Sequence, residues 1–155
     1  MFPLKDHHPS GKFPLVNVAL IVTNIYIFTK ELTVINLDLY INQYALIPAS
    51  IDATKPETLM PFITSMFLHA GFLHILSNMW FLWIFGDNVE ARLGHLKYLA
   101  FYLFCGIAAS LAQYLFISNS NLPMLGASGA IAGVLGAYLR FFPHSSIDTI
   151  VPVFG

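Results

Sequence analysis

The sequence predicts an all-α protein, a polytopic bundle of transmembrane helices. Three observations carry this prediction: 57% of the 155 residues are hydrophobic, only 10% are charged, and the mean hydropathy is +0.70. A soluble domain carries about 25% charged residues, and several apolar runs here approach the roughly 20 residues that cross a bilayer. We therefore expect four complete spans and the start of a fifth, surrounded by the lipid bilayer.

Charge and cysteine content exclude two other classes. The net charge is −1 and the basic residues form no cluster, which argues against nucleic-acid binding. Cys105 is the only cysteine and stands in an apolar run, where a thiol usually acts as a small packing side chain. The sequence therefore predicts neither a nucleic-acid partner nor a disulfide framework.

The amino-terminal part predicts a leader, one span and a long connection. Residues 1–12 are polar and predict a disordered cytoplasmic leader, and residues 13–155 are expected to form one membrane domain. The first span is expected at residues 13–30, where Asn17 and Asn24 indicate a face turned toward other helices. Residues 31–61 are too polar to span, so we expect an amphipathic connection at the membrane interface.

Three further apolar runs follow, separated by polar segments. Spans two, three and four are expected at residues 62–86, 98–117 and 127–142, with a charged turn at residues 87–97. Residues 149–155 are similar to the start of a fifth span, and seven residues cannot cross a bilayer. The sequence therefore predicts a truncated membrane domain.

The distribution of Lys and Arg predicts the orientation of this domain. With the amino terminus in the cytoplasm, the cytoplasmic segments hold Lys5, Lys12, Arg92, Lys97 and Arg140, and the outer segments hold Lys30 and Lys55. The positive-inside rule favours this orientation. The starts of spans two and four then face the outer side, so the polar residues at both starts share one level of the membrane.

A tract of small residues, 126–129 (Gly-Ala-Ser-Gly), opens the fourth span. A serine among glycines in a membrane helix is more often a packing residue than a nucleophile, and Gly129, Ala132, Gly133 and Gly136 form overlapping small-xxx-small patterns. At a helix amino terminus, free backbone N–H groups can also stabilise a developing oxyanion. From this tract alone, both interpretations of Ser128 stay open.

The second span carries two histidines and an asparagine, His69, His74 and Asn78. His74 and Asn78 are four residues apart, so they lie on one helix face and can both donate a hydrogen bond to one point. Polar groups at this depth are costly and usually functional, although hydrogen bonding between helices explains them equally well. A metal site is disfavoured, because His69 and His74 have the wrong angular spacing and no third ligand is evident. No cofactor is expected.

Together with the run at residues 86–94 (Gly-Asp-Asn-Val-Glu-Ala-Arg-Leu-Gly), these motifs resemble the rhomboid intramembrane serine proteases. The resemblance is strongest over residues 61–143 and places three motifs in the order and spacing of the family. It implies a six-helix core that cleaves transmembrane protein substrates near their membrane ends.

The resemblance also implies roles for individual residues. Ser128 would be the nucleophile, and His74 and Asn78 would form the oxyanion hole with the Ser128 N–H. His69 would be structural, Gly126 and Gly129 would flank the nucleophile, and Glu90 and Arg92 would belong to the cytoplasmic turn between helices two and three.

Two features depart from the family pattern. The first loop, residues 31–61, lacks the Trp-Arg pair found in many members. The general base of the family is a histidine on the sixth helix, beyond Gly155. His144 does not replace it, because 16 helical residues after Ser128 place it about 24 Å away, at the cytoplasmic end. Without its base a serine loses a factor of order 10⁶ in kcat, so the 155 residues alone are expected to be inactive.

Two other functions remain as alternatives. A non-catalytic rhomboid-like protein that binds transmembrane clients would have no need to keep Ser128, His74 and Asn78 together. A fragment of a transporter or channel is compatible with polar residues at one level, but intramembrane carboxylates are missing. The sequence favours the serine endopeptidase over both.

Overall fold

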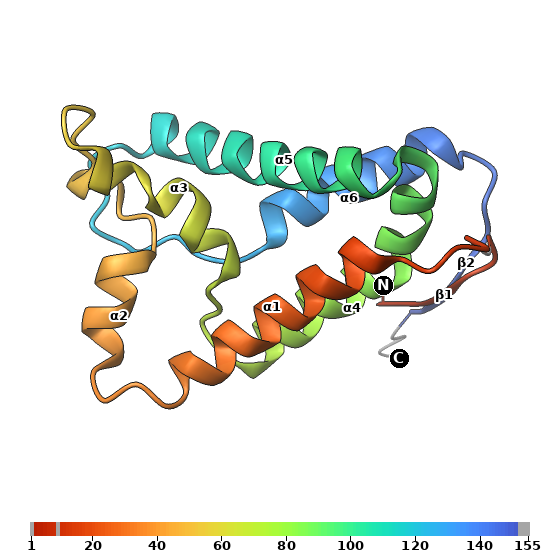
Figure 1. The fold of residues 1–155 in the computed structure, drawn as a ribbon, viewed down its shortest axis with the longest axis horizontal. Helices are drawn as coiled ribbons and strands as arrows, with labels where there is room; N and C mark the ends of the chain where they lie inside the picture. Colours follow the sequence, from red (N-terminus) through yellow and green to blue (C-terminus); the bar gives the residue numbers. More distant parts are fainter. Residues whose placement is uncertain (1, 9, 152–155) are drawn as a thin grey trace.

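A computed structural model describes residues 2–8 and 10–151, and most of these residues are helical (Figure 1). The predicted helical bundle is confirmed. Its four long helices are α1 (Leu15–Glu31), α4 (Phe72–Leu93), α5 (His95–Phe116) and α6 (Ser128–Phe141). The shorter elements are α2 (Leu37–Tyr44), η1 (Pro48–Ser50), η2 (Pro56–Leu59), α3 (Pro61–Thr64), η3 (Ser65–Phe67), and the strands β1 (Phe2–Asp6) and β2 (Ile147–Ile150).

Helix α4 lies at the centre of the bundle and contacts α1, α5 and α6. Its side chains Leu82 and Val89 are fully buried, and they belong to one apolar core with Tyr98 of α5 and Val134 of α6. Helix α4 packs antiparallel to α1 and α5, so its carboxyl end lies beside their amino ends (Figure 1). The packing of the core therefore determines which helix ends lie together at each end of the bundle.

A network of hydrogen-bonded polar side chains connects the helices at the end of the bundle where α4 ends. Both carboxylate oxygens of Glu90, which is 1% exposed, accept from the amino-terminal N–H groups of α1: Oε1 from Val16 at 2.9 Å and Oε2 from Asn17 at 2.7 Å. The Asn17 side chain donates to the Leu82 carbonyl and accepts from the Tyr98 hydroxyl. Glu90 thus caps α1 from another helix, and the negative charge suits the helix amino terminus.

Helices α5 and α6 approach so closely that only small residues fit between them. A methyl group added at Gly129 would lie 2.5 Å from Cβ of Ala109, and one added at Gly133 would lie 2.6 Å from Cβ of Cys105. The expected close packing is therefore present at two of the glycines. At Gly136 an added methyl group would have no neighbour within 4 Å.

We expect Gly133→Ala to destabilise the protein and Gly136→Ala to stabilise it. The first substitution forces α5 and α6 apart, an overpacking that typically costs about 1–3 kcal/mol. The second has free space and raises helix propensity, a gain of up to about 1 kcal/mol. Thermal unfolding of both variants in the same detergent measures the difference. Equal shifts in the two variants would contradict the contact between α5 and α6.

The expected second span, residues 62–86, is not one continuous helix. The chain breaks at Leu68–Gly71, and the segments Pro56–Phe67 and Phe72–Leu93 meet at 77°. Helix α5 is long and apolar enough to cross a membrane by itself. The two segments that meet at the bend, taken together as one span, are a second candidate. The number of spans therefore stays a prediction.

The charged turn expected at residues 87–97 is also absent as such. Helix α4 continues to Leu93, and Gly94, with φ +81°, is the only residue between α4 and α5. Glu90 lies in this additional length of α4, and from there it provides the buried cap for α1.

Two predictions about the chain ends are wrong for the described residues. Within the leader, residues 2–6 form β1, which pairs antiparallel with β2, so Thr149 and Ile150 are extended rather than helical. Asp6 accepts a hydrogen bond from Asn88 of α4, and the Trp80 indole of α4 donates to the Pro3 carbonyl at 2.7 Å. The sheet is therefore anchored to the bundle. Residues 152–155 of the expected fifth span lie outside the described residues.

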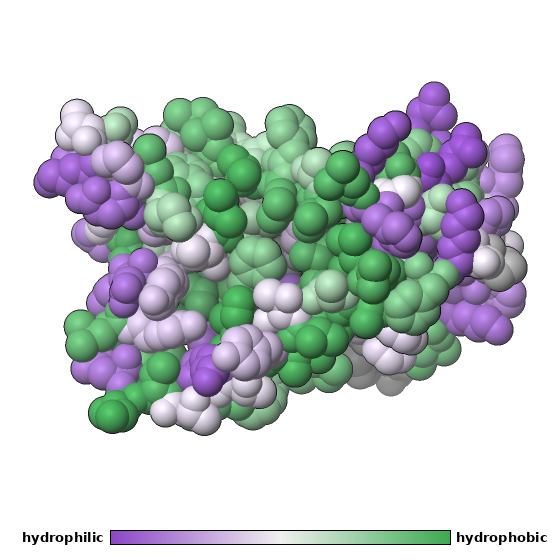
Figure 2. Space-filling view, viewed as in Figure 1, coloured by the Kyte–Doolittle hydropathy of each residue, from purple (hydrophilic) through white to green (hydrophobic). Residues whose placement is uncertain are grey.

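The surface agrees with a protein that sits in a bilayer. Figure 2 shows apolar side chains across the middle of one face and polar side chains gathered at both ends. Large apolar side chains of several helices are exposed, including Phe104 at 69%, Leu115 at 69% and Leu139 at 64%. Exposed apolar surface of this extent is typical of proteins in contact with lipid.

Candidate active site

Ser128 is the first residue of α6, and its side chain is exposed. The first backbone hydrogen bond of the helix runs from the Ile131 N–H to the Ala127 carbonyl at 3.0 Å. The N–H groups of residues 128–130 therefore have no partner within the helix. The hydroxyl of Ser128 stands beside backbone donors that can bind a negative oxygen.

The loop before Ser128 is held in place by backbone hydrogen bonds. Met124 and Leu46 exchange two of them, at 2.8 and 3.0 Å, so the connecting segment pairs with this loop. The Gly126 N–H donates to the Ser65 carbonyl at 2.8 Å. The position of Ser128 is thus fixed by two segments that come much earlier in the chain.

His74 and Asn78 of α4 face this loop, as their four-residue spacing predicts. A methyl group on Gly126 would lie 2.7 Å from Nε2 of His74 and 3.8 Å from Nδ2 of Asn78. Gly126 also has φ +121°, a conformation that favours glycine. The requirement for glycine at position 126 therefore has two causes, its backbone conformation and its closeness to His74.

Both side chains present donors to the space beside Gly126. The Ala70 N–H lies 3.4 Å from Nδ1 of His74, and in a neutral ring this acceptor role leaves the proton on Nε2. Asn78 is 7% exposed, and its Nδ2 has no hydrogen-bond partner among the described residues. A buried amide donor without a partner is costly, so this one is available for an acceptor that enters the site.

Two cavities meet at Ser128. One, of about 510 Å³, is lined by His74 and Ser128 together with the loop before α6. The other, of about 50 Å³, lies between α5 and α6 and is lined by Ser110, Gln113 and Ser128. The larger cavity joins the serine to His74, one of the two side-chain donors.

His69 is 3% exposed and lies in the helix break, with its ring 5.1 Å from that of His74. Its backbone N–H donates to both carboxylate oxygens of Glu31, at 3.1 and 3.2 Å. Glu31, the last residue of α1, is 5% exposed. Sequence reasoning missed this carboxylate, because Glu31 lies 38 residues from His69 and shares no periodicity with it.

Burial raises the pKa of the Glu31 carboxyl to about 7, and the His69 N–H opposes this shift. The folded protein therefore binds a proton more tightly than the unfolded chain, so the free energy of unfolding should fall as pH rises from about 4.5 to about 7. Glu31→Gln should remove up to about 3 kcal/mol of this pH dependence. Unfolding measured at several pH values gives the slope of the free energy of unfolding against pH. Glu57→Gln, at an exposed carboxyl in the segment that connects α1 and α4, serves as the control. An unchanged slope in Glu31→Gln would contradict the assignment.

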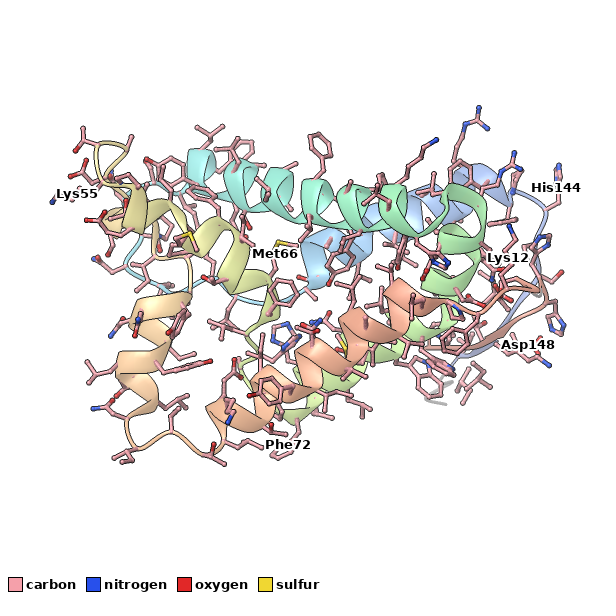
Figure 3. All side chains as sticks on the ribbon, viewed as in Figure 1. Lys12, Lys55, Met66, Phe72, His144 and Asp148 are labelled. Carbon is pink, nitrogen blue, oxygen red and sulfur yellow. The ribbon has the colours of Figure 1, made fainter. Side chains whose placement is uncertain are left out.

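The remaining candidate residues lie at the opposite end of the bundle. Glu90 contacts His95 of α5 as well as α1, whereas the Arg92 guanidinium forms no ion pair with any of residues 2–8 and 10–151. Figure 3 shows His144 at the same end as Lys12, far from the helix break that follows Met66. Within the described residues, no group of three His, Cys, Asp or Glu side chains is arranged to hold a metal ion.

Comparison with known families agrees with this geometry. A family model described as the rhomboid domain matches residues 56–155. The chain belongs to the rhomboid family. Rhomboid proteins are helical integral membrane proteins, and the family acts on transmembrane substrates within the bilayer. The sequence-based resemblance is therefore confirmed.

Several relatives are similar to this chain. Rhomboid protein 1, mitochondrial, of Saccharomyces cerevisiae is 39% identical over 89 residues, which are 55% of this chain and 26% of that protein. Rhomboid protease GluP of Bacillus subtilis is 43% identical over 77 residues, 50% of this chain and 15% of that protein. Presenilin-associated rhomboid-like protein A, mitochondrial, of Danio rerio is 32% identical over 94 residues, 59% of this chain and 24% of that protein. The aligned part thus spans about a quarter or less of each of these rhomboid relatives.

Proposed function

We propose that this chain contributes the nucleophile and the oxyanion hole of an intramembrane serine endopeptidase. The observation that carries the proposal is the unpartnered Nδ2 donor of Asn78, which lies with Nε2 of His74 beside the loop that leads into Ser128. Packing alone does not explain a buried amide donor without an acceptor. An oxygen that becomes negative during peptide cleavage is the kind of acceptor that such donors stabilise.

In the proposed reaction, the Ser128 hydroxyl attacks the carbonyl carbon of a transmembrane substrate near its membrane end. The carbonyl oxygen becomes negative and accepts hydrogen bonds from the Ser128 N–H, from Nε2 of His74 and from Nδ2 of Asn78. A histidine base, expected on a further helix of the family fold, takes the hydroxyl proton and gives it to the departing amine. Water then hydrolyses the acyl-serine and restores Ser128.

The orientation is part of the same proposal. Residues 1–12 lie on the cytoplasmic side, residues 13–155 belong to the membrane domain, and Ser128 opens toward the outer side. The Lys and Arg distribution supports this. So does the direction of α6, which begins at Ser128 and ends at Phe141, close in sequence to His144, and Figure 3 shows His144 at the same end as Lys12.

The proposal is tested with the protein encoded by the complete reading frame, reconstituted in proteoliposomes with a single-span reporter. We expect two reporter fragments, with the cut near the outer end of the span. A reporter whose span is replaced by a soluble linker should stay intact. An intact single-span reporter that nevertheless copurifies with the protein would instead support a non-catalytic binder of transmembrane clients.

A further inference from the structure

A further pocket lies at the end of the bundle opposite Ser128. Its volume is about 240 Å³, and it is lined by the segment before α1, the last turns of α4 and the residue after α6: His8, Ser10, Lys12, Asn88, Ala91, Arg92 and Phe142. The proposed peptidase reaction does not use this pocket.

The walls of this pocket carry positive charge. Lys12 and Arg92 both line it, and neither forms an ion pair within the part of the chain that the structure describes. The ring of His8, a hydrogen-bond donor in either protonation state, packs on Phe142 with 4.4 Å between ring centroids. None of the lining residues is acidic. Two cations without a paired carboxylate that face one cavity are a recognition pattern for an anion.

Three carboxyl groups lie near the pocket: Asp6, whose partner Asn88 lines it, and Asp87 and Glu90, which line a neighbouring cavity together with Lys12. Asp6 accepts hydrogen bonds from Nδ2 of Asn88 and from the His8 N–H. Both carboxylate oxygens of Glu90 accept hydrogen bonds from the amino end of α1. Within the described residues, none of these three carboxyl groups forms an ion pair with Lys12 or Arg92.

The position of the pocket indicates the source of the anion. Figure 3 places Lys12 at the polar end of the molecule, and Figure 2 shows the apolar band of the surface directly adjoining that end. The pocket wall itself combines cations with the aromatic ring of Phe142. A site where the apolar band meets positive charge fits a molecule that has acyl chains and an anionic headgroup.

We propose that this pocket binds the phosphate of an anionic phospholipid at the cytoplasmic surface. The Arg92 guanidinium and the Lys12 ammonium contact the phosphate oxygens, and the acyl chains lie along the exposed apolar side chains of the bundle. The cytoplasmic location rests on the orientation given in the proposed function, whereas lipid binding itself does not depend on peptidase activity, because it uses residues at the other end of the molecule.

The experiment measures lipid binding to the purified full chain in detergent by native mass spectrometry. Phosphatidylglycerol is the probe, and phosphatidylcholine, whose headgroup has no net charge, is the reference lipid. The double variant Lys12→Gln/Arg92→Gln should lose phosphatidylglycerol binding by roughly 10- to 30-fold. The matched control Lys97→Gln/Arg140→Gln removes two exposed cations from the same end that do not line the pocket, and it should bind as the wild type does.

Additional variants and a competing ion distinguish a specific lipid site from diffuse attraction and from a phosphate site. Lys12→Gln alone, in the segment between β1 and α1, should keep the fold and still weaken binding, and Arg92→Lys should retain most of it. Equal losses in the control and the pocket variants would show diffuse surface attraction and overturn the proposal. Equal binding of phosphatidylcholine would overturn it as well. Displacement of the lipid by millimolar inorganic phosphate would identify a site for free phosphate instead.

Discussion

Ser128→Ala should abolish cleavage of a single-span reporter by the full-length protein. The substitution removes the only atom that the proposed mechanism uses for attack, and it leaves the amino terminus of α6 and its N–H groups in place. In soluble serine proteases loss of the nucleophile lowers kcat by a factor of order 10⁶. Quantitative gel analysis of reporter fragments in proteoliposomes measures the effect.

Ser118→Ala is the matched control for this experiment. Ser118 is exposed in the segment between α5 and α6, and it lines neither cavity at the site. This variant should cleave as the wild type does. Undiminished cleavage by Ser128→Ala would remove Ser128 from the mechanism and return it to a packing role.

Asn78→Ala should lower kcat by roughly 10²- to 10³-fold, the usual cost of one lost oxyanion donor. The KM should change little, because the donor has its strongest partner only when the carbonyl oxygen becomes negative. The folded protein should lose little stability, because Nδ2 of Asn78 has no hydrogen-bond partner among the described residues to lose. Reporter titration separates kcat from KM, and thermal unfolding checks the fold.

Asn121→Ala, an exposed amide in the loop before α6, controls for the general effect of removing an asparagine. A kcat for Asn78→Ala equal to that of this control would exclude Asn78 from the oxyanion hole. A large loss of stability with unchanged kcat would show that Asn78 has a purely structural role.

Much of the bundle was predictable because its cause is local. The apolar runs predicted α1, α5 and α6 to within a few residues, and the four-residue spacing of His74 and Asn78 placed them on one face. The small residues Gly129 and Gly133 predicted close packing, and they do face Ala109 and Cys105. Each of these predictions depends on a pattern that a short stretch of sequence contains.

The remaining features depend on partners far away in the sequence. The break at Leu68–Gly71 contains no proline, and it is held in part by the Glu31 carboxylate from 38 positions earlier. Strand β1 forms because β2 pairs with it from the other end of the chain. Periodicity within a short stretch of sequence does not indicate such contacts. For this reason the predictions of a continuous second span and of a disordered leader are wrong.

The cap on α1 has a consequence for the order in which the protein is made. Pro14 gives α1 no side-chain cap, and the N–H groups of Val16 and Asn17 receive theirs from Glu90, 74 and 73 positions later in the chain. During synthesis α1 therefore leaves the ribosome with its amino end unfinished. It acquires its final hydrogen bonds only after α4 has been made and docked beside it, so completion of α1 depends on a helix that is made later.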